Sequence, residues 1–268
     1  MLWTLVIGSH RSGTNMLLHA LNKLPKVCNL SELIQVTFNR KQDQDETNCW
    51  RLPLLEQIFN SSDFPDYIKP QWLPWADLPS EDNVKTFLTS LFKDYSLHWA
   101  DILCGKILFQ QCPPQYHTLW QWLYSQPIKI IYLRRKNPLH IIISNENAVR
   151  NAEWFIHKHH KKEPSISKFE LTIQRVLRDL TFLSMCESYF TILTYKTPKA
   201  ILVDYDNLVN NWEYESKRIL QHMGLDPSIN SITPQSKKQI TVNYSSLVTN
   251  YDELKTYFRG TQYEHHFL

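Results

Sequence analysis

Short apolar runs alternate with segments of helical periodicity along this chain. Four runs are almost continuously apolar and are bounded by polar or turn-forming residues, as is typical of strands that are buried on both faces. They cover residues 2–7, 102–109, 128–133 and 200–203. Each run is too short to be a typical helix, so the pattern predicts four buried strands.

Helical patterns separate these strands. Apolar residues recur at helical spacing between Gly13 and Pro25, where proline ends the pattern. Asn137 and Pro138 predict a helix start, as N-cap and first helical residue. Gly224 marks a helix end. The predicted helices cover residues 14–24, 84–98, 138 to about 158, about 168–190, and 212–223.

This order of elements predicts an α/β fold. Strands that alternate with helices form a three-layer sandwich with a central, mainly parallel sheet. Ligands of such sheets bind at the carboxyl ends of the strands. We expect a single domain over residues 1–268, with a Pro-rich excursion at about 41–80 on the substrate side.

Composition narrows the class of protein. The 268 residues include 29 Lys+Arg and 26 Asp+Glu, a net charge of +3, which argues against a dedicated nucleic-acid partner. The apolar runs are too short to span a membrane, so we expect no membrane partner. The five cysteines lack CxxC spacing, which favours reduced thiols in a cytoplasmic protein and no metal site.

Two of only five glycines fall close together after the first predicted strand. Gly8 and Gly13 have the Gly-x4-Gly spacing of a P-loop, in which backbone N–H groups surround an anion. The lysine that follows the second glycine in P-loop NTPases is replaced by Thr14, while Arg11 supplies a cation inside the loop. A P-loop small-molecule kinase, a non-catalytic nucleotide-binding protein and a turn without a ligand remain alternatives.

Residues 9–15, Ser-His-Arg-Ser-Gly-Thr-Asn, resemble the 5′-phosphosulfate loop of sulfotransferases that use 3′-phosphoadenosine 5′-phosphosulfate (PAPS). Residues 130–138 with Ser144 resemble that family's 3′-phosphate segment, and residues 203–208 its Tyr-Glu-Asp-Leu segment. The resemblance covers most of the chain. It implies a PAPS co-substrate, a PAP product, no required metal, and a cofactor site made of His10, Arg11, Ser12, Gly13, Thr14, Asn15, Arg135, Ser144, Arg259 and Gly260.

One departure from the family pattern leaves open which cationic residue binds the 3′-phosphate. The family arginine lies eight residues before the serine, which is the offset of Lys136, whereas Arg135 lies nine before Ser144. We favour Arg135 as the cation that binds the 3′-phosphate, to which Ser144 would donate a hydrogen bond from its hydroxyl.

The resemblance also suggests catalytic residues. The general base of cytosolic sulfotransferases is a histidine after a strand, and residues 105–110 contain none. Bacterial carbohydrate and small-molecule sulfotransferases use a glutamate after the first helix, which implies Glu32. Lys106 is expected to support the bridging oxygen or the loop, and His10 is the alternative base.

The acceptor is expected to be a small molecule that receives the sulfuryl group on a hydroxyl or N–H. A sugar, a lipid headgroup or a natural product would fit a bacterial tailoring enzyme, and a saxitoxin-type toxin is one candidate. We expect the acceptor pocket to come from residues 35–80 and 145–170. The sequence gives no oligomeric state.

Overall fold

The computed structural model describes residues 2–34, 80–94, 100–151, 165–228, 230–234, 240 and 242–268. Within these ranges the chain forms a five-stranded parallel sheet in the order β2-β3-β1-β4-β5. Its strands are β1 (Leu2–Gly8), β2 (Val27–Glu32), β3 (Ile102–Leu108), β4 (Lys129–Arg134) and β5 (Ala200–Asp204). The α/β prediction is confirmed. The expected excursion at about 41–80 lies outside the described residues except for residue 80.

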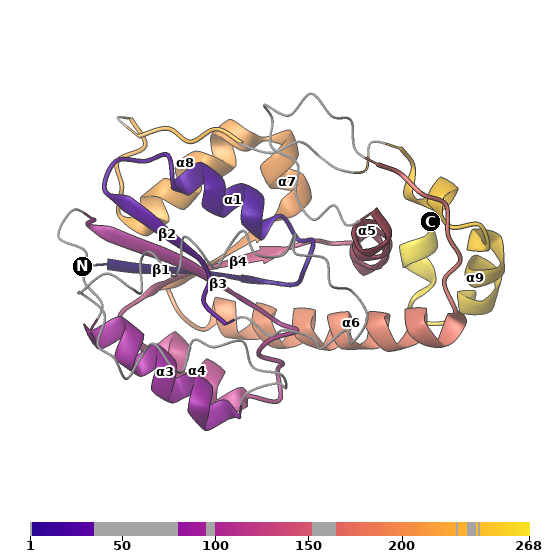
Figure 1. Ribbon diagram of the computed structural model, residues 1–268, viewed down its shortest axis with the longest axis horizontal. Coiled ribbons are helices and arrows are strands. Elements are labelled where there is room, and N and C mark those ends of the chain that lie inside the picture. The colour runs from indigo at the N-terminus through magenta and orange to yellow at the C-terminus, as the bar shows by residue number, and fades with distance from the viewer. Residues whose placement is uncertain are drawn as a thin grey trace.

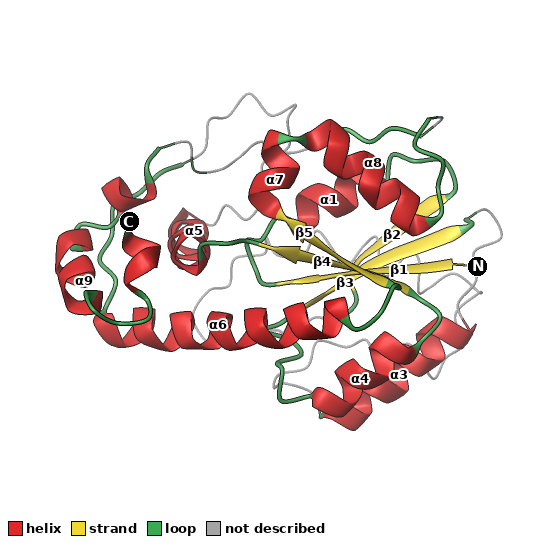
Figure 2. Cartoon of the chain, turned by 180° about the vertical axis from the view of Figure 1, so that it is seen from behind, coloured by secondary structure: helices red, strands yellow, loops and turns green. Residues whose placement is uncertain are grey.

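The central strand β1 separates two hydrophobic cores. Leu5 and Ile7 pack on one side of the sheet with residues of α3 (Glu81–Asp94), α4 (His117–Ser125) and α6 (Ile173–Tyr195). Val6 points to the other side, where α1 (Thr14–Leu21), α7 (Tyr205–Asn210) and α8 (Trp212–Met223) lie. Figures 1 and 2 show these two helical layers. The two-residue alternation of strand side chains therefore builds the predicted three-layer sandwich.

A third core joins the remaining elements beyond the carboxyl ends of the strands (Figure 1). It contains α5 (Pro138–Asn151), part of α6, η3 (Tyr244–Leu247), α9 (Tyr251–Phe258) and η4 (Glu264–Phe267). Asn137 begins α5 as predicted, because its Oδ1 accepts the N–H of Leu139 at 3.0 Å. Helix α5 is described only to Asn151, so the rest of the expected helix lies outside the described residues.

Several elements differ from the predictions. Helix α6 begins at Ile173, because the Thr172 side chain caps it and Phe169 forms a bridge with Val248. Strand β2 was not predicted, because its sequence Val-Cys-Asn-Leu-Ser-Glu mixes polar and apolar residues. Such mixing is compatible with its place at the edge of the sheet.

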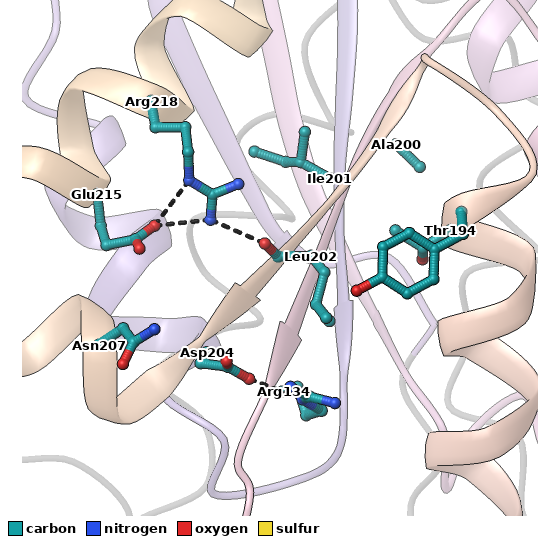
Figure 3. A pocket seen from close by; sticks show the side chains of 10 residues that line it. Arg134, Thr194, Ala200, Ile201, Leu202, Asp204, Asn207, Glu215 and Arg218 are labelled. Atoms are coloured by element: carbon teal, nitrogen blue, oxygen red, sulfur yellow. Dashed lines mark hydrogen bonds and ion pairs between the residues drawn. The ribbon is translucent and has the colours of Figure 1, made fainter.

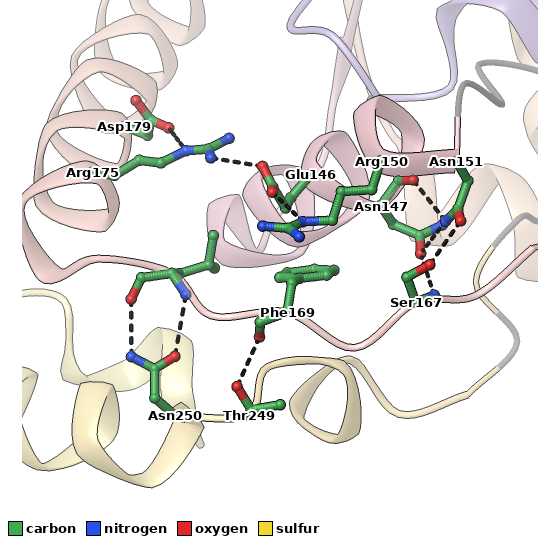
Figure 4. Close-up of polar contacts among 11 residues, drawn as sticks. Glu146, Asn147, Arg150, Asn151, Ser167, Phe169, Arg175, Asp179, Thr249 and Asn250 are labelled. Carbon is green, nitrogen blue, oxygen red and sulfur yellow. Dashed lines mark hydrogen bonds and ion pairs between the residues drawn. The ribbon is translucent and has the colours of Figure 1, made fainter.

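Helix α5 is fixed by two polar clusters at its C-terminal half (Figure 4). Glu146 is 5% exposed and pairs with Arg150 at 2.5 Å and with Arg175 of α6 at 2.6 Å. Asn151 donates to the carbonyl of Ser165 and accepts from the Ser167 hydroxyl at 2.7 Å. These contacts fix the position of the helix that carries Ser144.

Two partly buried histidines are expected to make the stability of the fold sensitive to acid. Burial, reinforced by Lys129, lowers the pKa of His222 to about 4, and its Nε2 donates to the Ile130 carbonyl at 3.1 Å. Burial and the neighbouring His265 lower the pKa of His266 to about 4. Both rings stay neutral in the folded chain, whereas they protonate near pH 6.5 when unfolded. We therefore expect stability that is complete above pH 6.5 and decreases as the pH falls to about 4.

Melting temperatures between pH 7 and 4 would test this expectation. Each decrease of 1 kcal/mol in the free energy of unfolding should lower Tm by about 2–4 °C. A His222→Gln variant, which keeps an N–H donor, should show a smaller decrease between pH 6.5 and 5. An identical pH profile for the variant would contradict the assignment of His222.

Candidate active site

The loop between β1 and α1 has the backbone of an anion cradle. Gly13 has φ +90°, and a Cβ there would lie 2.5 Å from the Tyr205 ring. A Cβ on Gly8 would lie 2.7 Å from the Leu133 carbonyl oxygen, so both glycines permit a close approach. Arg11 has φ 62°, the left-handed region that nests use. The Ser12 hydroxyl donates to the Ser9 carbonyl at 2.8 Å and closes the turn.

Two arginines meet at this loop. Arg11 donates from Nε to the Ser144 hydroxyl at 3.2 Å. Arg135 follows β4 and donates from Nη1 to the Arg11 carbonyl at 3.2 Å. The predicted partners Arg11, Arg135 and Ser144 are therefore brought together, although β4 and the loop are more than 100 residues apart.

Tyrosine rings enclose the Arg135 guanidinium. Its central carbon lies 5.1 Å from the centroid of the Tyr205 ring and 5.2 Å from that of Tyr244. Nη2 also donates to the Tyr244 hydroxyl. His140 stacks on Tyr244 with centroids 4.2 Å apart. The tyrosine rings stabilise a side chain that is only 7% exposed through cation–π contacts.

The charges at the loop favour the binding of an anion. Burial, followed by repulsion from Arg135, lowers the pKa of Arg11 to about 10. Within the described residues the buried Nε of Arg135 has no hydrogen-bond partner. A buried donor without a partner is unfavourable, and so are two guanidinium charges held close together. A bound polyanion would relieve both penalties.

The neighbouring cations are engaged elsewhere. Arg134 donates to Asp204 at 2.7 Å and to Glu187 at 3.1 Å. Lys136 lies 3.4 Å from Asp204 and its side chain is 55% exposed. Of these three consecutive cations, Arg135 is the one whose described contacts reach the loop; its role toward a 3′-phosphate stays a prediction.

A second polar group lies where β2 and β3 end. Glu32 and Lys106 are register partners on neighbouring strands, and Lys106 Nζ lies 2.9 Å from Glu32 Oε2. The same Nζ donates to Asn15 Oδ1 in α1 at 2.7 Å. Gln111 donates to the other carboxylate oxygen. The structure thus connects Glu32, Lys106 and Asn15, which the sequence suggested only separately.

The other predicted residues divide into two groups. Thr14 begins α1 and is buried, and the half-buried His10 donates its N–H to Gln110 Oε1 at 3.2 Å. Arg259 and Gly260 are exposed after α9, and the N–H of Gly260 donates to Glu264. The described contacts do not join these two residues to the loop, and α9 lies beyond α5 in Figure 1.

Sequence reasoning assigned no role to Tyr205, Tyr244 or Gln111. Tyr205 lies in the segment that resembles Tyr-Glu-Asp-Leu, so a signal for it existed. Tyr244 is 109 residues from Arg135, in a stretch without clear periodicity. The packing of η3 against α5 brings it to the loop.

A separate cavity of about 460 Å³ lies along the edge strand β5 (Figure 3). Its charged residues satisfy one another, since Arg218 pairs with Glu215 at 2.6 Å and Arg134 pairs with Asp204. Arg218 also donates to the Leu202 carbonyl at 2.8 Å and so covers the outer edge of β5. We therefore take the loop, and not this cavity, as the candidate site.

The described part of the chain contains no cluster of three or more His, Cys, Asp or Glu residues arranged to hold a metal ion. Within the same ranges, the helices are either too short or too polar to cross a membrane.

A family model of the sulfotransferase domain matches residues 3–267. No curated protein sequence matches the chain. Similar solved structures include a sulfotransferase from Alicyclobacillus acidocaldarius, with 12% identity, coverage of 95% of this chain and 90% of that one, and a TM-score of 0.46. A sulfotransferase domain of the Synechococcus PCC 7002 olefin synthase has 15% identity, coverage of 94% and 82%, and a TM-score of 0.48.

A mouse sulfotransferase complexed with PAP has 11% identity, coverage of 99% of this chain and 88% of that one, and a TM-score of 0.42. The family model spans nearly the whole sequence, including the loop and both arginines. This chain therefore belongs to the sulfotransferase domain family and is an enzyme of that class.

Proposed function

We propose that this protein transfers a sulfuryl group from PAPS to a hydroxyl or N–H of a small-molecule acceptor. The observation that carries the proposal is the convergence of Arg11 and the buried Arg135 on one glycine-bounded loop. PAPS is an anion at both its 5′ and its 3′ position, so it matches two cations held side by side.

Separate groups of residues fit the two anionic ends of this co-substrate. Arg11 and the backbone N–H groups up to Thr14 and Asn15 would hold the 5′-phosphosulfate at the N-terminus of α1. Arg135 and Ser144 would hold the 3′-phosphate, and the Nε of Arg135, which has no partner among the described residues, would then gain an acceptor. Because arginine is charged at neutral pH, Arg11 can stabilise the leaving phosphate without a change of protonation.

Glu32 is our proposed general base. The acceptor must lose a proton as sulfur is transferred, and a carboxylate at the carboxyl end of β2 lies at the sheet edge where ligands bind. If it is the base, Glu32→Gln lowers turnover while the loop still binds PAP. If Glu32→Gln remains fully active, His10 becomes the next candidate.

We propose a sugar, a lipid headgroup or a natural product as acceptor, with a saxitoxin-type toxin as one candidate. Cys28, Cys104, Cys112 and Cys186 are all free and buried, which supports a reducing, cytoplasmic location. A panel of such acceptors, assayed for release of PAP, would identify the substrate class.

A thermal-shift comparison tests the co-substrate. PAP should raise Tm more than ATP with Mg²⁺, because ATP lacks the 3′-phosphate that Arg135 and Ser144 would bind. At a ligand concentration 100 times Kd, the stabilisation should be about 2.7 kcal/mol. Adenosine 5′-monophosphate is the control that lacks the 3′-phosphate.

The two alternatives predict different results. A small-molecule kinase would be stabilised by ATP with Mg²⁺ and not by PAP. That outcome would contradict the sulfotransferase proposal. A non-catalytic nucleotide-binding protein would bind PAP yet transfer no sulfuryl group to any acceptor.

A further inference from the structure

The cations at the end of β4 lie on alternate faces of the sheet, as successive side chains of a strand do. Tyr132 packs in the core on the α6 side, and Leu133 packs in the core on the α1 side. Arg134 continues the first row, because its Nη1 lies 3.1 Å from the Glu187 carboxylate of α6. Arg135 continues the second row, because its guanidinium donates to a carbonyl of the phosphate loop.

The end of β5 repeats this arrangement. Asp204 is the register partner of Arg134, and its Oδ1 lies 2.7 Å from the Arg134 Nε (Figure 3). The next residue, Tyr205, packs against the core on the α1 side, and its ring lies 5.1 Å from the central guanidinium carbon of Arg135. Two neighbouring strands thus place an ion pair on one face of the sheet and a cation–π pair on the other.

The Asp204 carboxylate does not have the local role that its position favours. Asp204 is the N-cap residue of α7, where an aspartate commonly accepts an N–H of the first turn. Within the described residues its side chain makes no such capping hydrogen bond. Its two oxygens lie instead 2.7 Å from Arg134 Nε and 3.4 Å from Lys136 Nζ. The carboxylate therefore engages the first and third of the consecutive cations, and Arg135 between them contacts the loop.

The register of β4 decides which cation contacts the loop. A shift of a strand by one residue moves every side chain to the opposite face of the sheet. Such a shift would direct Arg134 or Lys136 to the loop and Arg135 toward α6. The pair of Arg134 with Asp204 stabilises one of these arrangements. Because the two side chains are only 20% and 14% exposed, water screens their attraction in part only.

We propose that Arg134 is a positioning residue for the 3′-phosphate of PAPS, an inference that rests on the proposed function. Its pair with Asp204 fixes the ends of β4 and β5 relative to each other. The pair thereby selects Arg135 as the cation at the loop and holds the Tyr205 ring against it. Arg134 acts through the residue that follows it and does not itself touch the co-substrate.

Calorimetric titration of Arg134→Met with PAP and with adenosine 5′-monophosphate tests the proposal without an acceptor. Methionine cannot pair with Asp204, so Arg135 is held less firmly. We expect the preference for PAP over adenosine 5′-monophosphate to fall by about tenfold, as when a residue that orients a metal ligand is lost. The affinity for adenosine 5′-monophosphate, which lacks the 3′-phosphate, should change much less. Arg134→Lys can restore the ion pair and should recover most of the preference.

Two control variants separate positioning from a simple loss of charge. Lys136→Met removes a positive charge beside the same carboxylate. Arg218→Met removes an arginine that pairs with Glu215 at 2.6 Å along the same edge strand. Both should keep the wild-type preference for PAP within about threefold. A loss in Lys136→Met equal to that in Arg134→Met would assign the effect to charge and overturn the positioning role.

A further variant keeps the test decisive if Arg134→Met does not fold. Arg134→Gln keeps a donor for Asp204 but no charge, and it should lose part of the preference for PAP. An unchanged preference in either folded variant would overturn the positioning role and leave the sulfotransferase proposal intact. Failure of the wild type to bind PAP would overturn both.

Discussion

Arg11→Met is expected to lower turnover by about 10²–10³-fold, the usual effect of removing one transition-state donor. Arg11 is the cation inside the loop itself, and its Nε donates to the Ser144 hydroxyl. Removing its charge removes stabilisation where negative charge develops on the leaving phosphate. Initial rates of PAP release with a working acceptor would measure the effect, and Arg178→Met, whose side chain is 73% exposed on α6, is a matched control.

The same variant should be at least as stable as the wild type when no ligand is present. Burial and Arg135 lower the pKa of Arg11, so its charged form is penalised in the folded chain. Removing the charge relieves that penalty at neutral pH. A melting curve without ligand should show an unchanged or higher Tm, while PAP should raise Tm less than it does for the wild type. Such a trade of stability for function marks an active site.

A marked decrease in ligand-free stability would give Arg11 a structural role instead. Full turnover in Arg11→Met would remove it from the chemistry altogether. Arg11→Lys separates the two properties of the side chain, because lysine keeps the charge but not the planar fork.

Four strands of the sheet could be predicted because their sequences are nearly continuous runs of apolar residues. Strands β1, β3, β4 and β5 coincide closely with the predicted ranges, and helix α8 matches its prediction. Helices α4 and α9 were not predicted. Each is short, with eight or nine residues, and is formed through its packing rather than through a strong local signal.

The site was only partly readable from the sequence. The loop and Arg135 lie in contiguous motifs, so their residues could be named in advance. The contacts of Arg135 with Tyr244 and of Lys106 with Asn15 join segments 109 and 91 residues apart. No periodicity encodes such pairs; they depend on the strand order of the sheet and on the packing of η3.

Arg135→Met and Lys136→Met should have opposite outcomes, although the two residues are neighbours. Arg135 is 7% exposed and contacts two tyrosine rings, and its Nε has no hydrogen-bond partner among the described residues, so this side chain can accommodate a charged group. Hydrogen bonds to charged groups are each worth about 1.5–3 kcal/mol, so the removal of two such bonds corresponds to a PAP affinity about 100-fold weaker or more.

Lys136 is half-exposed and lies 3.4 Å from Asp204, so its removal should change the Kd for PAP by less than about threefold, as for a surface ion pair. Direct titration with PAP and with adenosine 5′-monophosphate makes the comparison specific. Arg135→Met should bind the two ligands almost equally, because methionine cannot donate hydrogen bonds to the 3′-phosphate that distinguishes them. If Lys136→Met lost the preference for PAP and Arg135→Met kept it, the cation that holds the 3′-phosphate would be Lys136, at the spacing usual in the family, and Arg135 would serve only to hold the loop.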